Sequence, residues 1–336
     1  MPTVSLNGSI GFECATDDTL LRAALRAGLG MPYECNVGSC GTCKVELIGG
    51  EVTCNWAEAP GLSARDKTKN RVLACQSRPL ADCGIKARLQ DHCRPVHRPR
   101  RFRADLIGVG DLTHDMREFR FRSPTAPAFE PGQYALLELP GVNSVRAYSM
   151  SNLSNASGEW HFLIKRMPNG LGSAALFEKI EVGSSIEIDG PYGMAYLRPD
   201  SVRDLICIAG GSGLSPMISI ARGMAGEPKL AKRSLHFFYG GRGPADLWGD
   251  DMLATLPGYG ERIHFTPVIS MPQLDTGNTW SGAIGFVHEH VIAALGDRLA
   301  AFEYYFAGPP AMTQAVQAML VKNKVPFEQL HYDSFY

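Results

Sequence analysis

The pattern of hydrophobic and polar positions divides the chain into three segments. In the first segment, two short β-prone runs (Thr3–Asn7 and Ile10–Cys14) precede apolar residues at helical spacing over Leu20–Leu25. Either Asp18 or Thr19 can cap that helix. Further strands are expected at Lys44–Ile48, Arg71–Gln76 and Ile85–Leu89. The first segment therefore predicts a small α+β domain.

Alternation with a period of two residues dominates the second segment, from about residue 101 to 198. Its first helix of any length is expected at Gly172–Lys179. Strands separated by Gly, Pro and Asn turns are expected at Phe119–Arg122, Tyr134–Leu139, Trp160–Lys165 and Ser185–Asp189. This pattern predicts an antiparallel β-barrel.

From Asp204 onward the pattern changes to short buried strands that alternate with helices. Ser215 followed by Pro216 predicts the start of a helix, with a capping hydroxyl and then proline at the first helical position. Strands are expected at Leu205–Ala209, Leu235–Tyr239, Arg262–Ile269 and Tyr304–Ala307. The alternation predicts an α/β domain whose parallel sheet carries helices on both faces.

Composition agrees with a multidomain protein. The chain has 336 residues, of which 45% are hydrophobic and 20% charged, so it can build two or three packed domains. A net charge of −1 argues against nucleic acid as the main partner. Residues 94–103 contain five arginines and no acid, which favours a solvated linker over a docking site for an acidic partner. The boundaries expected are a domain at 1–93, a basic linker at 94–103, a barrel at 101–198 and a nucleotide-binding domain at 199–336.

One apolar stretch resembles a membrane span but is interrupted. Between Asp204 and Arg222 there are 17 uncharged residues, and glycines together with Pro216 break this stretch in the middle. A strand, a glycine turn and a helix fit better, so no membrane contact is expected. The chain shows no signal-peptide pattern at Thr3–Leu6, so we expect a cytoplasmic protein with reduced thiols.

The spacing of four of the nine cysteines carries the strongest chemical information. Four residues separate Cys35 from Cys40, two separate Cys40 from Cys43, and Cys75 follows after 31 more. This is the spacing of plant-type [2Fe–2S] sites, and the small residues between the cysteines let backbone N–H groups turn toward sulfur. An all-cysteine zinc site and unliganded thiols are the alternatives. The remaining cysteines have no such spacing and are expected to be bystanders: Cys14, Cys54, Cys83, Cys93 and Cys207.

A short polar set after a predicted strand suits a flavin. Arg146 can pair with a pyrophosphate, Tyr148 can stack on an aromatic ring, and Ser149 can hydrogen-bond a ring nitrogen. Gly170 and Ser173 then open a helix, whose N-terminal N–H groups form a second phosphate site. Without this context, the same residues would indicate only a strand with a surface arginine.

Two glycine turns follow strands of the third segment. Gly210, Gly211 and Gly213 lie between a buried strand and a helix, although Pro216 replaces the last glycine of the dinucleotide-binding fingerprint. Gly308 and Pro309 form a second turn after another strand. Ligands of open α/β sheets collect at the carboxyl ends of the strands, so both turns are candidates for a nucleotide site.

With these motifs in this order, the whole chain resembles the NADH-dependent reductase components of bacterial oxygenases. The runs Met31–Asn36 and Asn55–Arg65, and the ending from Asn323, resemble the reductase of toluene-type monooxygenases. The resemblance implies a β-grasp-like 2Fe–2S ferredoxin domain, an antiparallel FAD barrel and a parallel-sheet NAD-binding domain.

The resemblance also implies roles for single residues. Arg146, Tyr148 and Ser149 bind FAD, with Ser149 near the nitrogen that accepts hydride, and an aromatic residue at the C-terminus covers the flavin, for which we favour Phe335 over Tyr336. Ala307 stands where the family commonly has cysteine. The residues implied at the FAD pyrophosphate and at NADH are Gly170, Ser173, Gly210, Gly211, Gly213, Arg242, Gly308 and Pro309.

The resemblance implies an electron-transfer reductase. Electrons pass from NADH to FAD, to the 2Fe–2S cluster held by Cys35, Cys40, Cys43 and Cys75, and on to a Rieske-type ferredoxin or an oxygenase hydroxylase that acts on aromatic hydrocarbons or alkenes. A monomer is expected. The alternatives are the reductase of a Rieske aromatic-ring dioxygenase, a subunit of the sodium-pumping NADH–quinone reductase, and a zinc-stabilised nucleotide-binding protein with no redox role. Arg242 without a basic cluster favours NADH, although arginine is also what a 2′-phosphate needs.

Overall fold

The computed structural model describes residues 1–335, and its contacts divide the chain into two compact units. The first unit contains Met1–Phe102, Ala135–Ala147 and Glu187–Met194. The second contains Arg103–Tyr134, Tyr148–Ile186 and the chain from Ala195 onward. The first unit thus combines the N-terminal fold with portions of barrel strands that come much later in the sequence.

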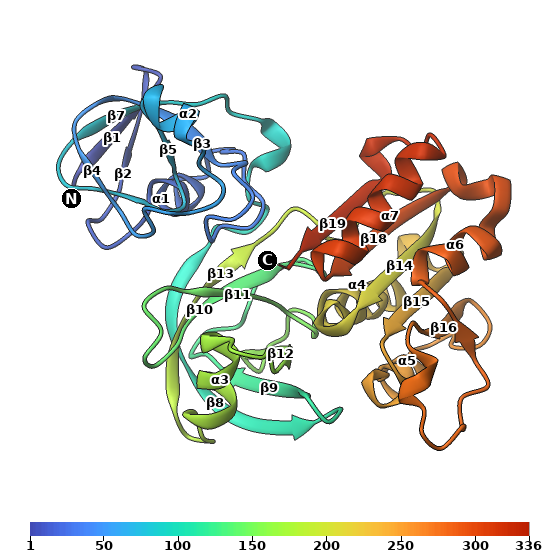
Figure 1. Ribbon diagram of the computed structural model, residues 1–336. Coiled ribbons are helices and arrows are strands. Elements are labelled where there is room, and N and C mark those ends of the chain that lie inside the picture. Colours follow the sequence, from blue (N-terminus) through green and yellow to red (C-terminus); the bar gives the residue numbers. More distant parts are fainter. Residues whose placement is uncertain (336) are drawn as a thin grey trace. The chain divides into compact units, whose positions relative to one another are not determined.

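A five-stranded mixed sheet forms the N-terminal fold of the first unit (Figure 1). Its strand order is β2-β1-β7-β3-β5; β1 and β7 run parallel, and the other neighbours are antiparallel. Helix α1 (Leu20–Arg26) buries its leucines and alanines in the core and is capped by Thr19, whose hydroxyl accepts from the N–H of Arg22 at 3.4 Å. The other elements are β1 (Thr3–Leu6), β2 (Ile10–Glu13), β3 (Lys44–Gly49), β4 (Val52–Cys54), α2 (Ala64–Thr68), β5 (Arg71–Leu73), β6 (Ser77–Pro79) and β7 (Cys83–Lys86). This is the predicted β-grasp-like fold.

A six-stranded sheet in the order β11-β10-β13-β8-β9-β12 forms the barrel. Along β9 and β12 the register opposes Phe119 to Phe162 and Phe121 to Trp160, so these buried rings lie in the barrel core. The elements are β8 (Arg100–Asp111), β9 (Met116–Arg122), β10 (Tyr134–Glu138), β11 (Arg146–Ser149), β12 (Glu159–Lys165), α3 (Leu171–Glu178) and β13 (Ser185–Tyr192). The alternating pattern in the sequence predicted β9, β10, β12 and β13, but it did not predict β8.

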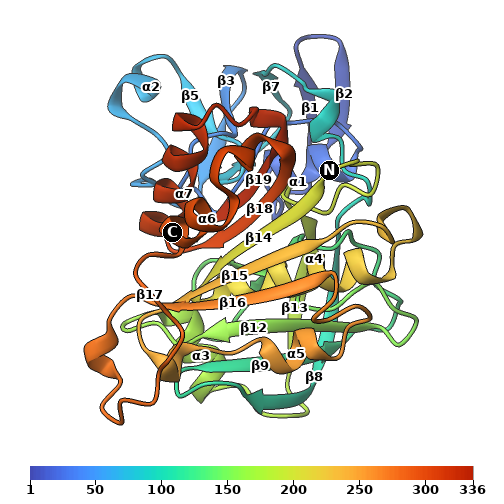
Figure 2. The same ribbon diagram turned by 90° about the vertical axis from the view of Figure 1, so that its right-hand side faces the viewer.

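A six-stranded parallel sheet forms the rest of the second unit, in the order β17-β16-β15-β14-β18-β19. Two separate apolar clusters cover its faces, one containing the leucines and methionines of α4 and α5 and the other the apolar residues of α6 and α7 (Figure 2). The elements are β14 (Asp204–Gly210), α4 (Leu214–Gly226), β15 (Leu235–Gly241), α5 (Asp250–Ala254), β16 (Ile263–Ile269), β17 (Ala283–Ile284), α6 (Val287–Leu295), β18 (Phe302–Gly308), α7 (Pro310–Lys322) and β19 (Leu330–Ser334). The predicted doubly covered parallel sheet is confirmed.

Several predicted element boundaries were wrong: β5 ends at Leu73 rather than Gln76, and β13 extends to Tyr192 rather than Asp189. Two further errors have a tertiary reason. Strand β7 begins at Cys83, because it pairs in parallel with β1, and it ends at Lys86, where the Asn7 side chain takes over both backbone hydrogen bonds of Ala87. Helix α4 begins at Leu214 with Gly213 as its N-cap, because a 3₁₀ turn at Gly211–Gly213 runs directly into it. Ser215 therefore lies inside the helix and does not cap it.

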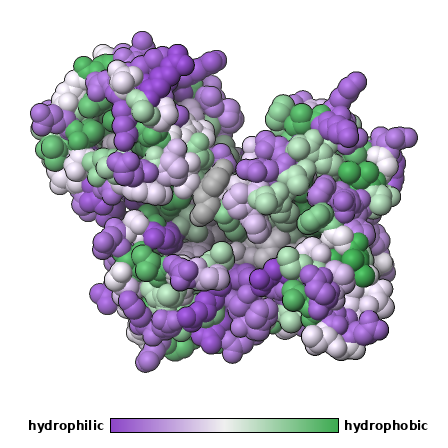
Figure 3. All heavy atoms as spheres, in the orientation of Figure 1, coloured by the Kyte–Doolittle hydropathy of each residue, from purple (hydrophilic) through white to green (hydrophobic). Residues whose placement is uncertain are grey.

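The stretch between Asp204 and Arg222 forms the buried strand β14 and most of α4 rather than a membrane span. Within residues 1–335, none of the helices combines the length and the apolarity that crossing a bilayer requires. On the face shown in Figure 3, small apolar groups are scattered among polar side chains.

Candidate functional site

The four candidate cluster ligands lie in the first unit, on the loop before β3 and directly after β5. Cys43 and Cys75 are buried, whereas Cys35 and Cys40 are partly exposed. The thiols face one another in two pairs, because Cys35 shares a hydrogen bond with Cys40 and Cys43 shares one with Cys75. Two facing pairs fit a group of two irons, each of which takes two thiolates.

Hydrogen-bond donors surround these sulfur atoms. The backbone N–H of Cys40 donates to Cys35 Sγ (3.4 Å), and that of Thr42 donates to Cys40 Sγ (3.5 Å). The side-chain amide of Gln76 donates to Cys75 Sγ (3.7 Å). The hydrogen bond from the Cys35 thiol, together with those from Thr42, outweighs the effect of burial and lowers the pKa of Cys40 to about 5. These donors fit a site that must stabilise the negative charge of thiolate and sulfide.

Gly41 allows the cluster loop to pass very close to the segment that follows β4. Its φ angle is +80°, and a Cβ at this position would lie 2.6 Å from the carbonyl oxygen of Gly61. The N–H of Gly61 in turn donates to the carbonyl of Gly38 at 3.0 Å. A residue with a side chain cannot replace Gly41 without moving one of these two loops.

The five cysteines outside the motif do not join this site. Cys14, Cys83, Cys93 and Cys207 are buried elsewhere, and Cys54 is exposed on β4. Burial raises the pKa of the Cys207 thiol well above its ordinary value, so it remains a neutral apolar group in the core of the parallel sheet.

The candidate flavin residues Arg146, Tyr148 and Ser149 lie on one short strand, β11. Arg146 is partly exposed, and its guanidinium donates to the carbonyl oxygen of Ser144 at 3.0 Å. Ser149 is buried, and its carbonyl oxygen accepts a hydrogen bond of 2.7 Å from the hydroxyl of Ser215 on α4. A cationic group, an aromatic ring and a hydroxyl thus follow one another along the strand, which fits a flavin dinucleotide.

The N-terminus of α3 carries Gly170 and Ser173. Gly170 is the N-cap residue, and the buried Ser173 hydroxyl donates to the Gly170 carbonyl at 3.1 Å while it accepts from the N–H of Met167 at 3.0 Å. Ser173 therefore shapes the turn from inside. The free N–H groups of the first helical turn are the groups that this arrangement offers to a phosphate.

The two glycine turns lie side by side, because they follow the neighbouring parallel strands β14 and β18. A Cβ on Gly213 would lie only 1.9 Å from the carbonyl oxygen of Ala307, so the turn after β14 touches the end of β18. Gly210, Gly211 and Gly213 thus lie next to Gly308 and Pro309 at the carboxyl edge of the sheet. This is the edge at which open α/β sheets bind nucleotides.

Ser215 is a structural residue of the second unit whose role the sequence misassigned. Its hydroxyl donates to the Ser149 carbonyl oxygen (2.7 Å) and accepts from the N–H of Leu163 (3.2 Å). It thereby joins the helix after the first glycine turn to two barrel strands. The Ser-Pro pair is typical of a helix start, so the sequence predicted that the Ser215 hydroxyl caps the helix rather than bonding to the barrel strands.

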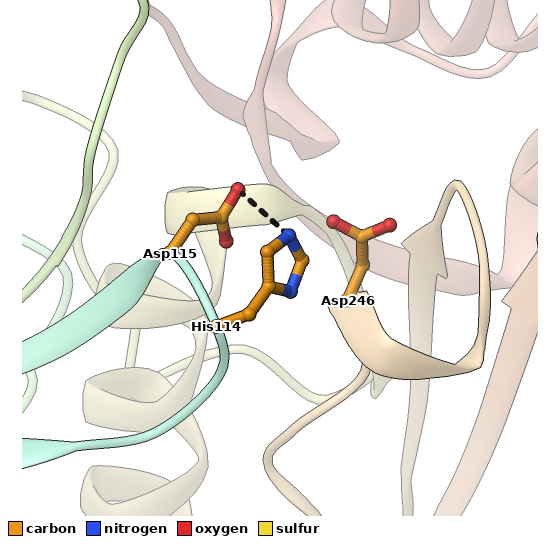
Figure 4. Close-up of side chains that lie close together, drawn as sticks. All are labelled: His114, Asp115 and Asp246. Carbon is orange, nitrogen blue, oxygen red and sulfur yellow. Dashed lines mark ion pairs between the residues drawn. The ribbon is translucent and has the colours of Figure 1, made fainter.

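A network of ion pairs joins Asp115 and Asp246, two of the three side chains drawn in Figure 4. Lys165 Nζ lies 3.0 Å from Asp115 Oδ2 and 3.0 Å from Asp246 Oδ1, and Arg242 Nη2 lies 3.2 Å from the same Asp246 oxygen. Burial raises the pKa of Asp246, but the hydrogen bond from Lys165 outweighs it and the net result is a pKa of about 2. Sequence reasoning found Arg242 but missed Lys165, Asp115 and Asp246, which come from three distant segments.

His114, Asp115 and Asp246 are residues of types that bind metal ions, and their ligand atoms lie within 4.8 Å of one another. The two carboxylates already pair with the cations of Lys165 and Arg242, so their charge is balanced without a metal ion. Next to them is a hollow of about 550 Å³ that includes the loop from Arg166 to Gly170 in its wall. The wall of this hollow combines the paired cations with Asp115 and includes Gly170, the N-cap residue of α3.

Phe335 packs against the apolar cluster on the α4 side of the parallel sheet, and its N–H donates to the carbonyl of Gly308 at 3.1 Å. The C-terminal aromatic residue is thus anchored to the second glycine turn. Tyr336, the alternative aromatic residue, lies outside the described residues. Ala307 precedes Gly308 and contributes no thiol.

Domain families match the three regions in the predicted order. Residues 4–80 match the 2Fe–2S iron–sulfur cluster binding domain, residues 103–196 match the oxidoreductase FAD-binding domain, and residues 207–318 match the oxidoreductase NAD-binding domain. The first match decides against a structural zinc site. The cofactors of this protein are therefore a 2Fe–2S cluster, FAD and a nicotinamide dinucleotide.

Full-length relatives include two reductases. The chain is 41% identical to the ferredoxin–NAD(P)+ reductase CarAd of Metapseudomonas resinovorans over all of both chains. It is 40% identical to the ferredoxin–NAD+ reductase component of the alkene monooxygenase system of Xanthobacter autotrophicus, over 98% of this chain and 99% of the relative. Among solved structures, the ferredoxin reductase in carbazole 1,9a-dioxygenase matches with a TM-score of 0.92 and 38% identity, over 100% of this chain and 98% of that one.

The thiol pairs, the flavin strand and the paired glycine turns occur in one chain, and these relatives match it from end to end. The chain belongs to the family of FAD- and 2Fe–2S-dependent ferredoxin–NAD(P)+ reductase components of oxygenase systems.

Proposed function

We propose that this reductase oxidises NADH and delivers its electrons to a Rieske-type ferredoxin, which serves the hydroxylase of an aromatic or alkene monooxygenase. Residues 1–93 carry the cluster, 101–198 the FAD and 199–336 the NADH, with 94–103 as the connecting basic stretch. The observation that carries the proposal is the set of two facing thiol pairs, surrounded by N–H donors, in a chain that also holds a flavin strand and a nucleotide edge.

The residues have separate tasks in this proposal. When bound, the flavin supplies the conversion of a two-electron hydride donor into single electrons. Ser149 hydrogen-bonds the flavin ring and Phe335 covers the site that the nicotinamide enters, while Tyr148 stacks and Arg146 pairs with the pyrophosphate. The cluster ligands are Cys35, Cys40, Cys43 and Cys75, and the remaining cofactor contacts are Gly170, Ser173, Gly210, Gly211, Gly213, Arg242, Gly308 and Pro309.

NADH rather than NADPH is the proposed donor because the charge of Arg242 is already matched. Its guanidinium lies 3.2 Å from Asp246 and 3.8 Å from Asp115. A 2′-phosphate near Arg242 would therefore also meet two carboxylates, which repel it. Replacing Asp115 by Asn is expected to raise kcat/KM with NADPH relative to NADH by about tenfold, since like-charge contacts weaken binding by on the order of 1 kcal/mol or more. An unchanged ratio would contradict the proposed basis of preference.

The names of two relatives support a ferredoxin as acceptor, because CarAd and the alkene monooxygenase component are both ferredoxin reductases. The test is turnover of a hydroxylase by the full-length protein, with and without a purified Rieske ferredoxin. Turnover that requires the ferredoxin supports the proposal, and equal turnover without it overturns the proposed acceptor. Light scattering of the same holoprotein tests the expected monomer, since a dimer has twice the mass.

A second candidate is the reductase of a ring-hydroxylating dioxygenase. The match to the ferredoxin reductase in carbazole 1,9a-dioxygenase favours it, because the two chains superpose over their whole length. The same reconstitution with a Rieske dioxygenase and its ferredoxin separates the two systems. Higher coupled turnover with the dioxygenase than with the diiron hydroxylase would transfer the assignment to this second class.

A further inference from the structure

A buried ion pair joins the cluster-bearing fold to a barrel strand inside the first unit. The Arg26 guanidinium, at the end of α1, lies with Nη1 2.8 Å from Asp189 Oδ1 and with Nη2 2.8 Å from Asp189 Oδ2, so the pair is bidentate. Asp189 lies on β13 and its side chain is 7% exposed. The two residues are 163 positions apart in the sequence, and nothing in the cofactor chemistry described above uses either of them.

Neighbouring groups hold the guanidinium in this orientation. Arg26 Nε donates to Asp18 Oδ2 at 3.0 Å, and the Tyr192 hydroxyl donates to Asp189 Oδ1 at 2.9 Å while it lies 3.2 Å from Arg26 Nη1. Burial raises the pKa of Asp189, but the hydrogen bond and charge of Arg26 outweigh it, so the net shift is downward. The carboxylate is therefore charged, desolvated and satisfied by a fixed fork of donors.

The same helix also holds the cluster loop. One turn before Arg26, the buried Arg22 donates from Nε to Asn36 Oδ1 (3.3 Å) and from Nη2 to the Asn36 carbonyl (3.4 Å). Asn36 directly follows the candidate ligand Cys35. A second contact runs in parallel, because the N–H of Gly193 donates to the Tyr33 hydroxyl at 2.9 Å. Helix α1 thus connects the cluster loop to the end of β13 through two arginines spaced four residues apart.

We propose that the Arg26–Asp189 pair is a latch that fixes the cluster-bearing fold on β13, which makes both residues positioning residues for electron transfer between FAD and the cluster. The inference rests on the proposed function for its consequence, but the latch itself is a property of the chain. Neither residue touches a cofactor. They act by keeping helix α1, and with it the cluster loop, in one place relative to the barrel strand.

The first test measures the latch without any redox reaction. Hydrogen–deuterium exchange is compared between the wild-type holoprotein and Asp189→Asn, over residues 186–193 and 20–26. In this variant the guanidinium keeps Asp18 but loses its bidentate partner on β13, so we expect exchange in both segments to rise by about tenfold or more. Arg94→Gln is the control, because the Arg94–Asp91 pair (3.1 Å) lies in the same unit but is exposed, and its loss should change exchange by less than about threefold.

The second test separates the flavin from the cluster. In stopped-flow mixing with NADH, the bleaching of the flavin should keep its wild-type rate in Asp189→Asn, while reduction of the cluster should slow by about tenfold or more, since small displacements of reacting groups cost large factors in rate. Arg26→Lys keeps the positive charge but loses the two parallel N–H donors. Its rate of cluster reduction should therefore lie between those of the wild type and Asp189→Asn. The triple variant Asp18→Asn/Arg26→Gln/Asp189→Asn, which removes all three charges of this ion-paired group, should recover part of the loss.

Different results separate the latch from the proposed electron path. Unchanged exchange and unchanged cluster reduction in Asp189→Asn, with unaltered circular dichroism, would overturn the latch. Raised exchange without slower cluster reduction would keep the contact but overturn its role in positioning. Slower flavin bleaching in this variant would also contradict the proposal, because it would mean that the substitution damages the flavin site itself.

Discussion

The cluster loop and the nucleotide edge are both rich in glycine, but they are built in different ways. Three of the four candidate cluster ligands lie within nine consecutive residues, and their N–H donors come from the same loop. At the nucleotide edge, the turns after β14 and β18 are about a hundred residues apart in the chain and meet only because the strands are neighbours. A site encoded locally depends on few residues, whereas a site assembled from distant segments depends on the packing that brings them together.

The largest effect is expected where the local site loses a ligand. In Cys75→Ala the cluster should lose its candidate ligand outside the loop, so bound iron should fall from about two atoms per chain to nearly none while FAD remains bound. Metal analysis and the visible absorption spectrum measure both quantities. Cys54→Ala is the control, because this exposed thiol lies outside the motif. Full iron content in Cys75→Ala would remove this residue from the ligand set.

The nucleotide edge should instead fail through its packing. In Gly213→Ala the added methyl group would lie 1.9 Å from the Ala307 carbonyl oxygen, so the two turns must separate. We expect KM for NADH to rise by about tenfold or more, since overpacking costs about 1–3 kcal/mol. Steady-state kinetics with NADH tests this expectation.

Gly226→Ala is the matched control for that variant. Gly226 ends α4, and a Cβ added there would have no neighbouring atom within 4 Å. This control should keep the wild-type KM. Equal kinetics in both variants would show that the contact between the two turns does not support nucleotide binding.

A smaller effect is expected where the nucleotide edge is joined to the barrel. Ser215→Ala removes the hydroxyl that serves both Ser149 and Leu163 and leaves a buried carbonyl without its donor. The cost should be about 1–3 kcal/mol, which appears as a lower midpoint of thermal unfolding. Ser157→Ala, at an exposed position, should change the midpoint little. A Ser215→Ala midpoint as high as that of this control would contradict the structural role of the hydroxyl.

The smallest effect concerns acid. The folded pKa of Asp246, about 2, lies below its ordinary value of 3.8, so its ion pairs contribute stability that is complete above that ordinary value and is lost as the pH falls toward about 2. The difference in unfolding midpoint between the wild type and Asp246→Asn should therefore be constant from neutral pH down to about 5 and shrink at lower pH. A difference that grows on acidification would have the wrong sign and would reject the ion-pair explanation.

Sequence patterns were sufficient for most elements because burial leaves a periodic trace. Helix α1 and the strands β10, β12, β14, β15, β16 and β18 were predicted close to their observed bounds, whereas β8, β17 and β19 were not predicted. The errors fell where partners distant in sequence decided the outcome. Asn7 ends β7 by bonding to Ala87, and the turn at Gly211–Gly213 moved the start of α4 so that Ser215 faced the barrel.

The candidate sites show the same division. Spacing predicted the four motif cysteines as ligands, and residue types in their strand context predicted the flavin residues and both glycine turns; these assignments stay predictions. The sequence could not identify Lys165, Asp115 and Asp246 as one network, because an isolated charged residue carries no trace of the residue it will pair with. For the same reason nothing in the sequence connected Arg26 with Asp189.

By itself, the sequence determined which chemistry this protein carries and in what order, because cluster ligands and glycine turns are local and their spacing is dictated by covalent geometry and by the size of the groups they hold. The tertiary structure alone decided which charges meet, that Ser215 joins α4 to the barrel, and that α1 is tied to β13. Those contacts form between residues tens to hundreds of positions apart, and only the burial of whole sheets and helices brings them within hydrogen-bond distance.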